Sequence, residues 1–554
     1  IQIAAARGFK DVIELFIEYG ADVNALEGEF GSALQVAAYE DIVEILIKHG
    51  ADINIQGGTY GSTLQVTTEK GNTNMVEFLI KHGADINAEG GELCSVQGNC
   101  AKGGKYGSAL QAAAHRGKAD IVEILIKQDA DINAQKGQYG SALQAAVSGT
   151  SKNFKDVIEV FIEYGADVNV HGGQDGSALQ VAAYGSEIDI VEMLIKHGAN
   201  VNAKGGKYGS ALQAAAHRGK ADIVEILIKQ DADINAQEWG YGSALQAAVS
   251  ESNTDIVEIL IKHGADINAQ GSSALKTAVC QGNADIVEIL IKHGADIDPQ
   301  EGEYGSALQY AALGGHTDIV ETLLKHGANV NAQGKEYGSA LQAAALESNT
   351  DIVKILIEHG ADINAQGGEY GSVLQAAAFN GNTDIVAILM KHGADINAQG
   401  GEYGSALQAA AEGGNINIIE TLLKHGANVN AQGGEYYGSA LQAAAYEGYI
   451  DIVETLLKYG ANVNAQGEKY GSALQAAAYE GHLDIVETLL KHGTNINAQG
   501  GEYGSALQAA ALGDDINIIE TLLKHGANVN AQGGKYGSAL QVAAYWGHTD
   551  IVEI

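Results

Sequence analysis

The chain repeats itself about every 33 residues along most of its length. The motif Gly-Ser-Ala-Leu-Gln, for example, places leucines at positions 308, 341, 374 and 407, each 33 residues after the last. A fixed period of this size is typical of a solenoid, in which each repeat buries its apolar face only against its neighbours. We therefore predict a single continuous array of about seventeen repeats over residues 1–554, rather than several globular domains.

The repeat that begins at Ser472 shows how each unit is expected to fold. Ser472 and Gln475 have the spacing of a capping box, in which the two side chains satisfy free N–H groups at the start of a helix. Small residues follow, and Gly481 is expected to end this first helix. Asp484 is expected to cap a second helix, whose large apolar residues recur at helical spacing. Gly493 supplies the left-handed residue that commonly ends a helix.

A glycine-rich segment joins each second helix to the next repeat. Residues 495–503 read Asn-Ile-Asn-Ala-Gln-Gly-Gly-Glu-Tyr and are expected to form an extended finger. Because the finger tyrosine recurs so regularly, we interpret it as a packing residue that stacks on its neighbours. It stands, for example, at Tyr304, Tyr337, Tyr370 and Tyr403.

Together these motifs resemble the ankyrin repeat. Ser-Ala-Leu-Gln-Ala-Ala stands where the ankyrin signature has Thr-Pro-Leu-His-x-Ala-Ala, and Gly-His-Leu-Asp-Ile-Val-Glu-Thr-Leu-Leu and Gly-Ala-Asn-Val-Asn-Ala also look like that repeat. The resemblance implies an all-α ankyrin-repeat solenoid, with a helix–turn–helix and a β-hairpin-like finger in each repeat, and a concave protein-binding surface. The repeat style is also similar to that of long arrays in filamentous fungi, which often follow a NACHT-type nucleotide-switch domain or another effector.

Two positions vary between repeats while the rest of each repeat barely changes. They are the fifth and sixth residues after the anchor leucine, at the end of the first helix. Exposed positions can simply drift, but drift mostly yields polar residues, whereas large apolar and aromatic residues are frequent here and are typical of binding hot spots. We predict that a protein partner binds at Tyr184, Leu313, Leu346, Phe379, Tyr446, Tyr479, Leu512, Tyr545 and Trp546.

We also expect these varying positions to be free of packing. Replacing Leu313, Leu346 and Phe379 together by serine would then weaken partner binding and leave stability nearly unchanged. Replacing the finger tyrosines Tyr337 and Tyr370 would instead lower stability, because they pack.

The composition disfavours several classes of function. The net charge of −37 disfavours nucleic acid, since a phosphate backbone requires a basic surface, and it fits neutral or basic protein partners. No apolar run approaches the length of a membrane span, and no signal peptide opens the sequence, so no membrane association is expected. Three cysteines in 554 residues make no disulfide framework, which favours a reducing compartment and a cytoplasmic protein.

No motif for catalysis or for a cofactor departs from the repeat pattern. The sequence has no phosphate-binding loop, no His-Glu-x-x-His and no Gly-x-Ser-x-Gly motif. Many histidines stand in Lys-His-Gly at the end of the second helix, where they are expected to cap it. Adjacent copies would lie about 8–10 Å apart, too far to share a metal ion. We predict no enzyme activity, cofactor, metal site or small-molecule substrate.

Residues 89–105 form an irregular insertion between two repeats. They include Cys94 and Cys100 but no further metal ligands nearby, so a surface loop is favoured over a metal site. The array also starts and stops inside a repeat, because Ile1 stands in the place of an anchor leucine and Ile554 falls within a second helix. We therefore expect the sequence to be truncated at both ends.

The sequence thus predicts a non-catalytic array that binds a protein partner on its concave surface. The resemblance suggests the sensor region of a larger fungal NACHT-like receptor. Two alternatives stay open: a free-standing scaffold or adaptor, and the targeting array of an enzyme whose catalytic domain lies outside this sequence.

Overall fold

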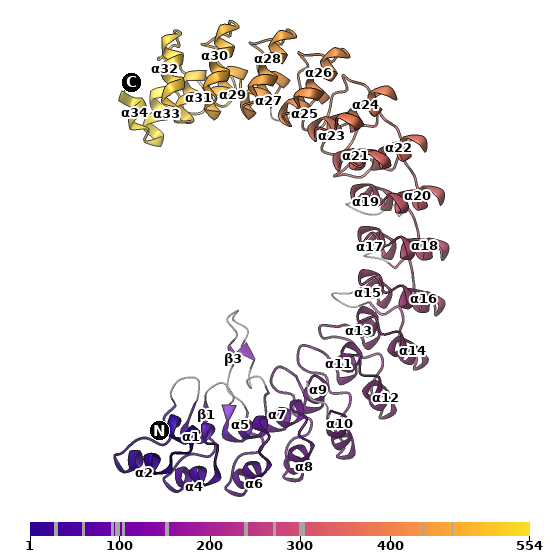
Figure 1. Cartoon of the computed structure of the whole chain (residues 1–554), viewed down its shortest axis with the longest axis vertical. Coiled ribbons are helices and arrows are strands. Elements are labelled where there is room, and N and C mark those ends of the chain that lie inside the picture. The colour runs from indigo at the N-terminus through magenta and orange to yellow at the C-terminus, as the bar shows by residue number, and fades with distance from the viewer. Residues whose placement is uncertain are drawn as a thin grey trace. The chain divides into compact units, whose positions relative to one another are not determined.

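A computed structural model of the chain describes residues 1–26, 31–57, 61–89, 93–94, 100–101, 106–149, 154–237, 242–269, 273–298, 305–434, 437–467 and 469–553. Contacts within the chain divide it into two units, Ile1–Thr277 and Ala278–Ile554. Each unit consists of consecutive helix pairs joined by short turns (Figure 1). The odd-numbered helix of each pair is the first helix, and the even-numbered one is the second helix.

The helices up to the boundary between the units are α1 (Gln2–Arg7), α2 (Lys10–Glu18), α3 (Ala33–Val36), α4 (Glu40–Lys48), α5 (Thr63–Lys70), α6 (Thr73–Lys81), α7 (Ala109–His115), α8 (Ala119–Lys127), α9 (Ala142–Val147), α10 (Phe154–Glu163), α11 (Ala178–Gly185), α12 (Ile188–Lys196), α13 (Ala211–His217), α14 (Ala221–Lys229), α15 (Ala244–Ser250), α16 (Thr254–Lys262) and α17 (Ala274–Cys280). Two short antiparallel strand pairs accompany them: β1 (Gln56–Gly57) with β2 (Gly61–Ser62), and β3 (Leu93–Cys94) with β4 (Cys100–Ala101).

The second unit continues with α18 (Ala284–Lys292), α19 (Ala307–Leu313), α20 (Thr317–Lys325), α21 (Ala340–Leu346), α22 (Thr350–Glu358), α23 (Val373–Phe379), α24 (Thr383–Lys391), α25 (Ala406–Glu412), α26 (Ile416–Lys424), α27 (Ala440–Glu447), α28 (Ile450–Lys458), α29 (Ala473–Glu480), α30 (Leu483–Lys491), α31 (Ala506–Leu512), α32 (Ile516–Lys524), α33 (Ala539–Trp546) and α34 (Thr549–Glu553).

Most first helices begin directly after the serine that the sequence predicts as their cap. Before α29, the Ser472 hydroxyl accepts a hydrogen bond from the Gln475 N–H (3.4 Å), and Gln475 Oε1 accepts one from the Ser472 N–H (2.5 Å). This confirms the predicted capping box. The same reciprocal cap precedes α3, α5, α7, α9, α11, α13, α15, α19, α21, α23, α31 and α33.

The core of each unit lies between its first and second helices. Anchor leucines such as Leu308 and Leu341 are completely buried. Within the second unit, first helices pack on first helices, as α27, α29 and α31 do, and second helices pack on second helices (Figure 1). Each repeat therefore buries its apolar residues against the repeats on either side.

The second helices start before the residue that the sequence indicates. α30 begins at Leu483 and its N-cap is His482, so the prediction that Asp484 caps this helix is wrong. Asp484 lies within the first turn, where a carboxylate interacts favourably with the positive end of the helix dipole. Its Oδ1 accepts a hydrogen bond from the neighbouring Ile485 N–H (2.9 Å).

The Lys-His-Gly motif ends the second helices, as predicted. His492 is the C-cap of α30, and its Nδ1 lies 2.9 Å from the carbonyl oxygen of Thr488. Since a carbonyl oxygen only accepts, Nδ1 carries the proton of this hydrogen bond. Gly493 follows with φ +77°. The same histidine contact occurs at His82, His293, His326, His359, His425 and His525.

The fingers are narrow hairpins that stack on each other. Gly500 and Gly504 form a single antiparallel bridge, which confirms the hairpin-like finger. The start of the predicted finger is not extended, however, because the Asn497 N–H bonds to Asn495 Oδ1 (3.1 Å) and closes a turn there. Gly501 has φ +60°, and a Cβ at this position would lie 2.4 Å from the backbone nitrogen of Gly471, so only glycine allows neighbouring fingers to lie this close.

The predicted insertion at residues 89–105 carries the β3–β4 pair, in which Cys94 and Cys100 face each other across the two strands. Its residues 90–92, 95–99 and 102–105 lie outside the described residues, as does the finger tyrosine Tyr304.

Candidate functional site

The fingers and the C-terminal ends of the first helices together form what we call the finger face of each unit. All nine predicted partner-binding residues lie at the ends of first helices, Tyr184 in the first unit and the others in the second. Tyr545 and Trp546 are exposed, at 72% and 53%. The other seven are half-buried: Tyr184, Leu313, Leu346, Phe379, Tyr446, Tyr479 and Leu512.

The aromatic members of this set are not free of packing, so that part of the prediction is wrong. The ring of Phe379 lies between two finger tyrosines, with centroids 6.0 Å from Tyr370 and 4.7 Å from Tyr403. Tyr184 stacks on the finger residue Tyr208 at 3.9 Å. The reason is geometric: the finger of the next repeat lies beside the end of the first helix, so a large ring at that end reaches the finger ring.

The finger tyrosines stack on one another between repeats, as predicted. The ring centroids of Tyr370 and Tyr403 are 5.4 Å apart with 20° between the planes, and those of Tyr437 and Tyr470 are 5.5 Å apart with 21°. Rings at the helix ends join them, because Tyr446 lies 4.5 Å from Tyr470. The result is a continuous row of rings formed by Tyr437, Tyr446, Tyr470, Tyr479 and Tyr503.

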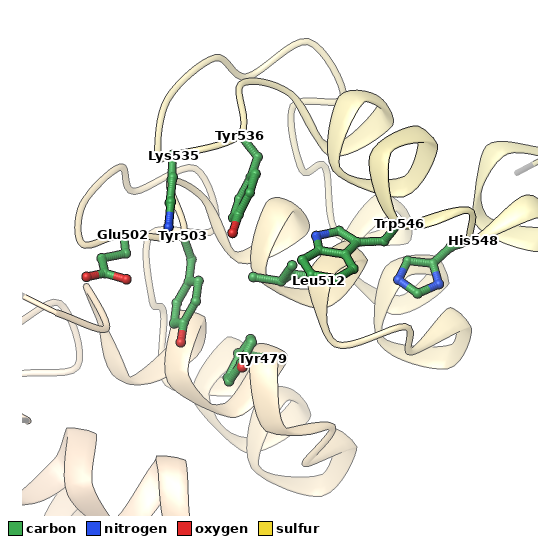
Figure 2. A pocket seen from close by; sticks show the side chains of 8 residues that line it. All are labelled: Tyr479, Glu502, Tyr503, Leu512, Lys535, Tyr536, Trp546 and His548. Atoms are coloured by element: carbon green, nitrogen blue, oxygen red, sulfur yellow. The ribbon is translucent and has the colours of Figure 1, made fainter.

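An open hollow of about 390 Å³ lies at the end of this row. The structure brings three of the predicted residues together there, since Tyr479, Leu512 and Trp546 all line it. Figure 2 shows Tyr503 and Tyr536 reaching down from two successive fingers toward the helix ends. The other lining residues are Glu502, Lys535 and His548. The hollow thus offers ring faces together with both signs of charge, which suits side chains of a protein partner.

Carboxylates accompany the rings in the second unit. Tyr437 donates a hydrogen bond from its hydroxyl to Glu447 Oε1 (2.9 Å). Burial, and then the neighbouring carboxylates of Glu447 and Glu402, raise the pKa of Glu412 to about 7. Burial and the bond to Glu447 also raise the pKa of Tyr437, which keeps its phenol protonated as a donor.

The first unit carries the corresponding rings with cations beside them. Arg116 forms an ion pair with Glu69, and the Tyr106 hydroxyl also bonds to this carboxylate (3.4 Å). The Arg218 guanidinium lies 4.9 Å above the ring centre of Tyr184. Guanidinium groups are therefore accommodated on this type of surface by both carboxylates and rings.

Metal-binding clusters and membrane-spanning helices would indicate other kinds of function for the part of the chain that the structure describes. No three or more His, Cys, Asp or Glu side chains there lie close enough together to hold a metal ion. Within the same residues, no helix is both long and apolar enough to cross a membrane.

A family profile described as ankyrin repeats (three copies) matches almost every residue, over residues 1–90, 92–172, 150–238, 212–301, 298–367, 368–433, 432–500 and 474–554. The chain belongs to the ankyrin-repeat family. The predicted fold class, an all-α ankyrin-repeat solenoid, is confirmed by this match and by the paired helices. Ankyrin repeats generally serve as protein–protein interaction modules and are typically non-catalytic. The ankyrin array has no match among curated proteins.

Sequence analysis missed the side chains that tie one ankyrin repeat to the next. Gln375 not only caps its own helix but also donates from Nε2 to the carbonyl oxygens of Gly400 (2.8 Å) and Gly404 (2.7 Å) in the following finger. Asn364 accepts from the Asp395 N–H (2.8 Å) of the next repeat. The available signal was that these polar residues recur nearly as regularly as the anchor leucine.

Proposed function

We propose that this ankyrin array is a non-catalytic recognition module whose protein partner binds on the finger face. The supporting observation is the row of stacked rings, in which Tyr470 is buried but its neighbours remain partly exposed: Tyr437, Tyr446, Tyr479 and Tyr503. Rings held in place by stacking lose little conformational freedom on binding, and aromatic side chains dominate interface hot spots. A surface on which fixed aromatic rings recur from one repeat to the next is well suited to bind an extended segment of a protein partner.

The proposal keeps all nine predicted residues as partner contacts, with a changed role for the aromatic ones. Three of these rings have two roles, since each stabilises the neighbouring finger and presents an edge or face to the partner. They are Phe379, Tyr446 and Tyr479. Leu313 and Leu346 remain apolar contacts at equivalent positions of neighbouring repeats. The acidic composition favours a neutral or basic protein partner over nucleic acid.

We extend the proposal to the biological setting that the resemblance suggests. The array would be the sensor region of a larger cytoplasmic receptor of the fungal NACHT-like type, in which partner binding controls an attached effector. A free-standing scaffold would use the same face without an effector, and an enzyme's targeting array would use it to bring a substrate protein close.

Site-specific photo-crosslinking tests the proposed function. Benzoylphenylalanine replaces Tyr479 or Leu512 on the finger face, and Glu454 or Glu487, which lie on the exposed side of α28 and α30, as controls. After irradiation in an extract of the cells that make the protein, both finger-face positions should capture the same protein, and the controls should not. Capture of one protein from the α28 and α30 positions alone would contradict the proposal.

A further inference from the structure

We infer that one part of the finger face binds an arginine- or lysine-bearing segment of the protein partner. This inference rests on the proposed function, because it assigns the chemistry of the partner at that face. The surface concerned, which we call the acidic aromatic patch, consists of Tyr403, Glu412, Tyr437, Tyr446 and Glu447 in the second unit.

The patch combines finger and helix-end rings with two carboxylates. Tyr446 is 5.3 Å from Tyr437 between ring centroids, and Tyr437 holds Glu447 through its hydroxyl. The carboxyl of Glu412 feels the negative charge of Glu447, and no Lys or Arg among the described residues forms an ion pair with Glu412. The patch is half-buried, so these charges are only partly hydrated.

The first unit shows what the same positions look like when the chain supplies its own cation. Glu69 stands five residues after the anchor Leu64, and Arg116 stands six after the next anchor, Leu110. There the Arg116 guanidinium pairs with Glu69, and the Tyr106 phenol bonds to the same carboxylate. At this place, the chain itself thus supplies the guanidinium that balances the carboxylate beside the finger tyrosine.

In the patch, the position equivalent to Arg116 is an acid. Glu412 stands five residues after Leu407, and Glu447 stands six after Leu441, so Glu412 corresponds to Glu69 and Glu447 to Arg116. The finger tyrosine Tyr437 corresponds to Tyr106. Two carboxylates and a phenol therefore lie where the first unit has one carboxylate, a phenol and a guanidinium, and a cation from a partner would balance them.

The rings of the finger face can also hold a cation. Arg218 lies over the ring of Tyr184, and the Lys469 ammonium lies 5.0 Å from the ring centre of Tyr470. In an extended segment, side chains on one side are spaced by roughly 6.6 Å. This is close to the 5.4 Å between the stacked finger rings Tyr370 and Tyr403. Basic side chains on one side of an extended partner are therefore spaced on a scale similar to that of these neighbouring finger rings.

Fluorescence anisotropy with a defined peptide tests the inference on the full chain. The probe is a labelled peptide of alternating alanine and arginine, compared with the same peptide in which citrulline, a neutral analogue, replaces arginine. At about pH 8, where Glu412 is ionised, the arginine peptide should bind at least about tenfold more tightly. Joint replacement of Glu412 and Glu447 by glutamine should remove most of that difference.

Two further variants separate the patch from the general negative charge of the chain. The pair Glu454→Gln and Glu487→Gln removes the same charge from exposed second-helix positions and should change affinity by less than about twofold. Glu447→Arg introduces the cation that Arg116 supplies to Glu69, so it should block the peptide and raise the melting temperature.

Three results would overturn the inference. One is equal loss of binding in both double variants, and another is equal binding of the arginine and citrulline peptides. The third is dimerisation of the chain that Glu412→Gln and Glu447→Gln abolish, since the patch would then bind a second copy. Crosslinking of a partner at Tyr479 together with any of these results would leave the proposed function standing and refute only the basic partner.

Discussion

Glu412 shows that position in the array, rather than residue type, sets the chemistry of a side chain. The equivalent Glu69 has Arg116 beside it, whereas burial, and then the charges of Glu447 and Glu402, raise the pKa of Glu412 to about 7. The titratable groups that interact with it are Glu402 and Tyr403 from its own finger, Tyr437 from the next finger and Glu447 from α27. A copy-by-copy comparison of the sequence detects the exchange of Arg for Glu but not its proximity to Glu412.

The raised pKa predicts a pH dependence of stability. A native carboxyl that titrates near 7 instead of 4.5 stays protonated when the unfolded chain has already lost its proton, so stability falls as pH rises from about 4.5 to 7. Glu412→Gln should therefore unfold at the same urea concentration as the wild type near pH 4.5. Near pH 8 the variant should be more stable than the wild type by about 1 kcal/mol. This value is smaller than the full pKa shift implies, because solvent screens a partly exposed carboxylate.

A Glu454→Gln variant controls for the loss of one negative charge. Glu454 lies on the exposed side of α28, away from the patch. A Glu412→Gln variant that is less stable than the wild type at pH 8 would show that its carboxylate stabilises the array.

At the scale of elements, one glutamine per repeat links helix capping to repeat stacking. Gln375 Oε1 accepts from the Ser372 N–H (2.6 Å), and its Nε2 donates to two carbonyl oxygens of the next finger. The side chain is completely buried. A buried group with all its hydrogen bonds made is costly to replace, because its partners then remain unsatisfied.

Replacing Gln375 by glutamate should separate these two roles. The carboxylate can still accept from Ser372 but has no donor for Gly400 and Gly404, so we expect a loss of about 2–3 kcal/mol in the free energy of unfolding. Gln366→Glu makes the same chemical change at an exposed position and should alter stability by less than about 0.5 kcal/mol. Urea denaturation measures both, and equal stability of the two variants would refute the role of Gln375.

The contact between helix end and finger leads to a third prediction. Phe379→Ser removes a ring that lies between Tyr370 and Tyr403, so it should lower stability by about 1–3 kcal/mol. Tyr19→Ser removes a ring that is 84% exposed and should have little effect. A Phe379→Ser variant with wild-type stability would instead restore the original expectation that this position is free of packing.

At the scale of the whole molecule, the fold was predictable because the local signals that define one repeat recur in nearly all the others. Ser472 and Gln475, the Lys-His-Gly ends and the finger glycines each have a local physical role that a sequence reveals. What could not be predicted depends on neighbouring repeats. Phe379 meets Tyr403 from the following repeat, and Asp484 loses its capping role because α30 starts earlier at Leu483.

Hydrogen–deuterium exchange of the full chain, with and without a bound protein partner, tests the central claim most directly. If the partner binds on the finger face, exchange should slow in the fingers and at the ends of the first helices, for example over residues 403–412 and 437–447. Exchange in the second helices α26 and α28 should stay unchanged. Slower exchange confined to α26 and α28, with none in the fingers, would contradict the account.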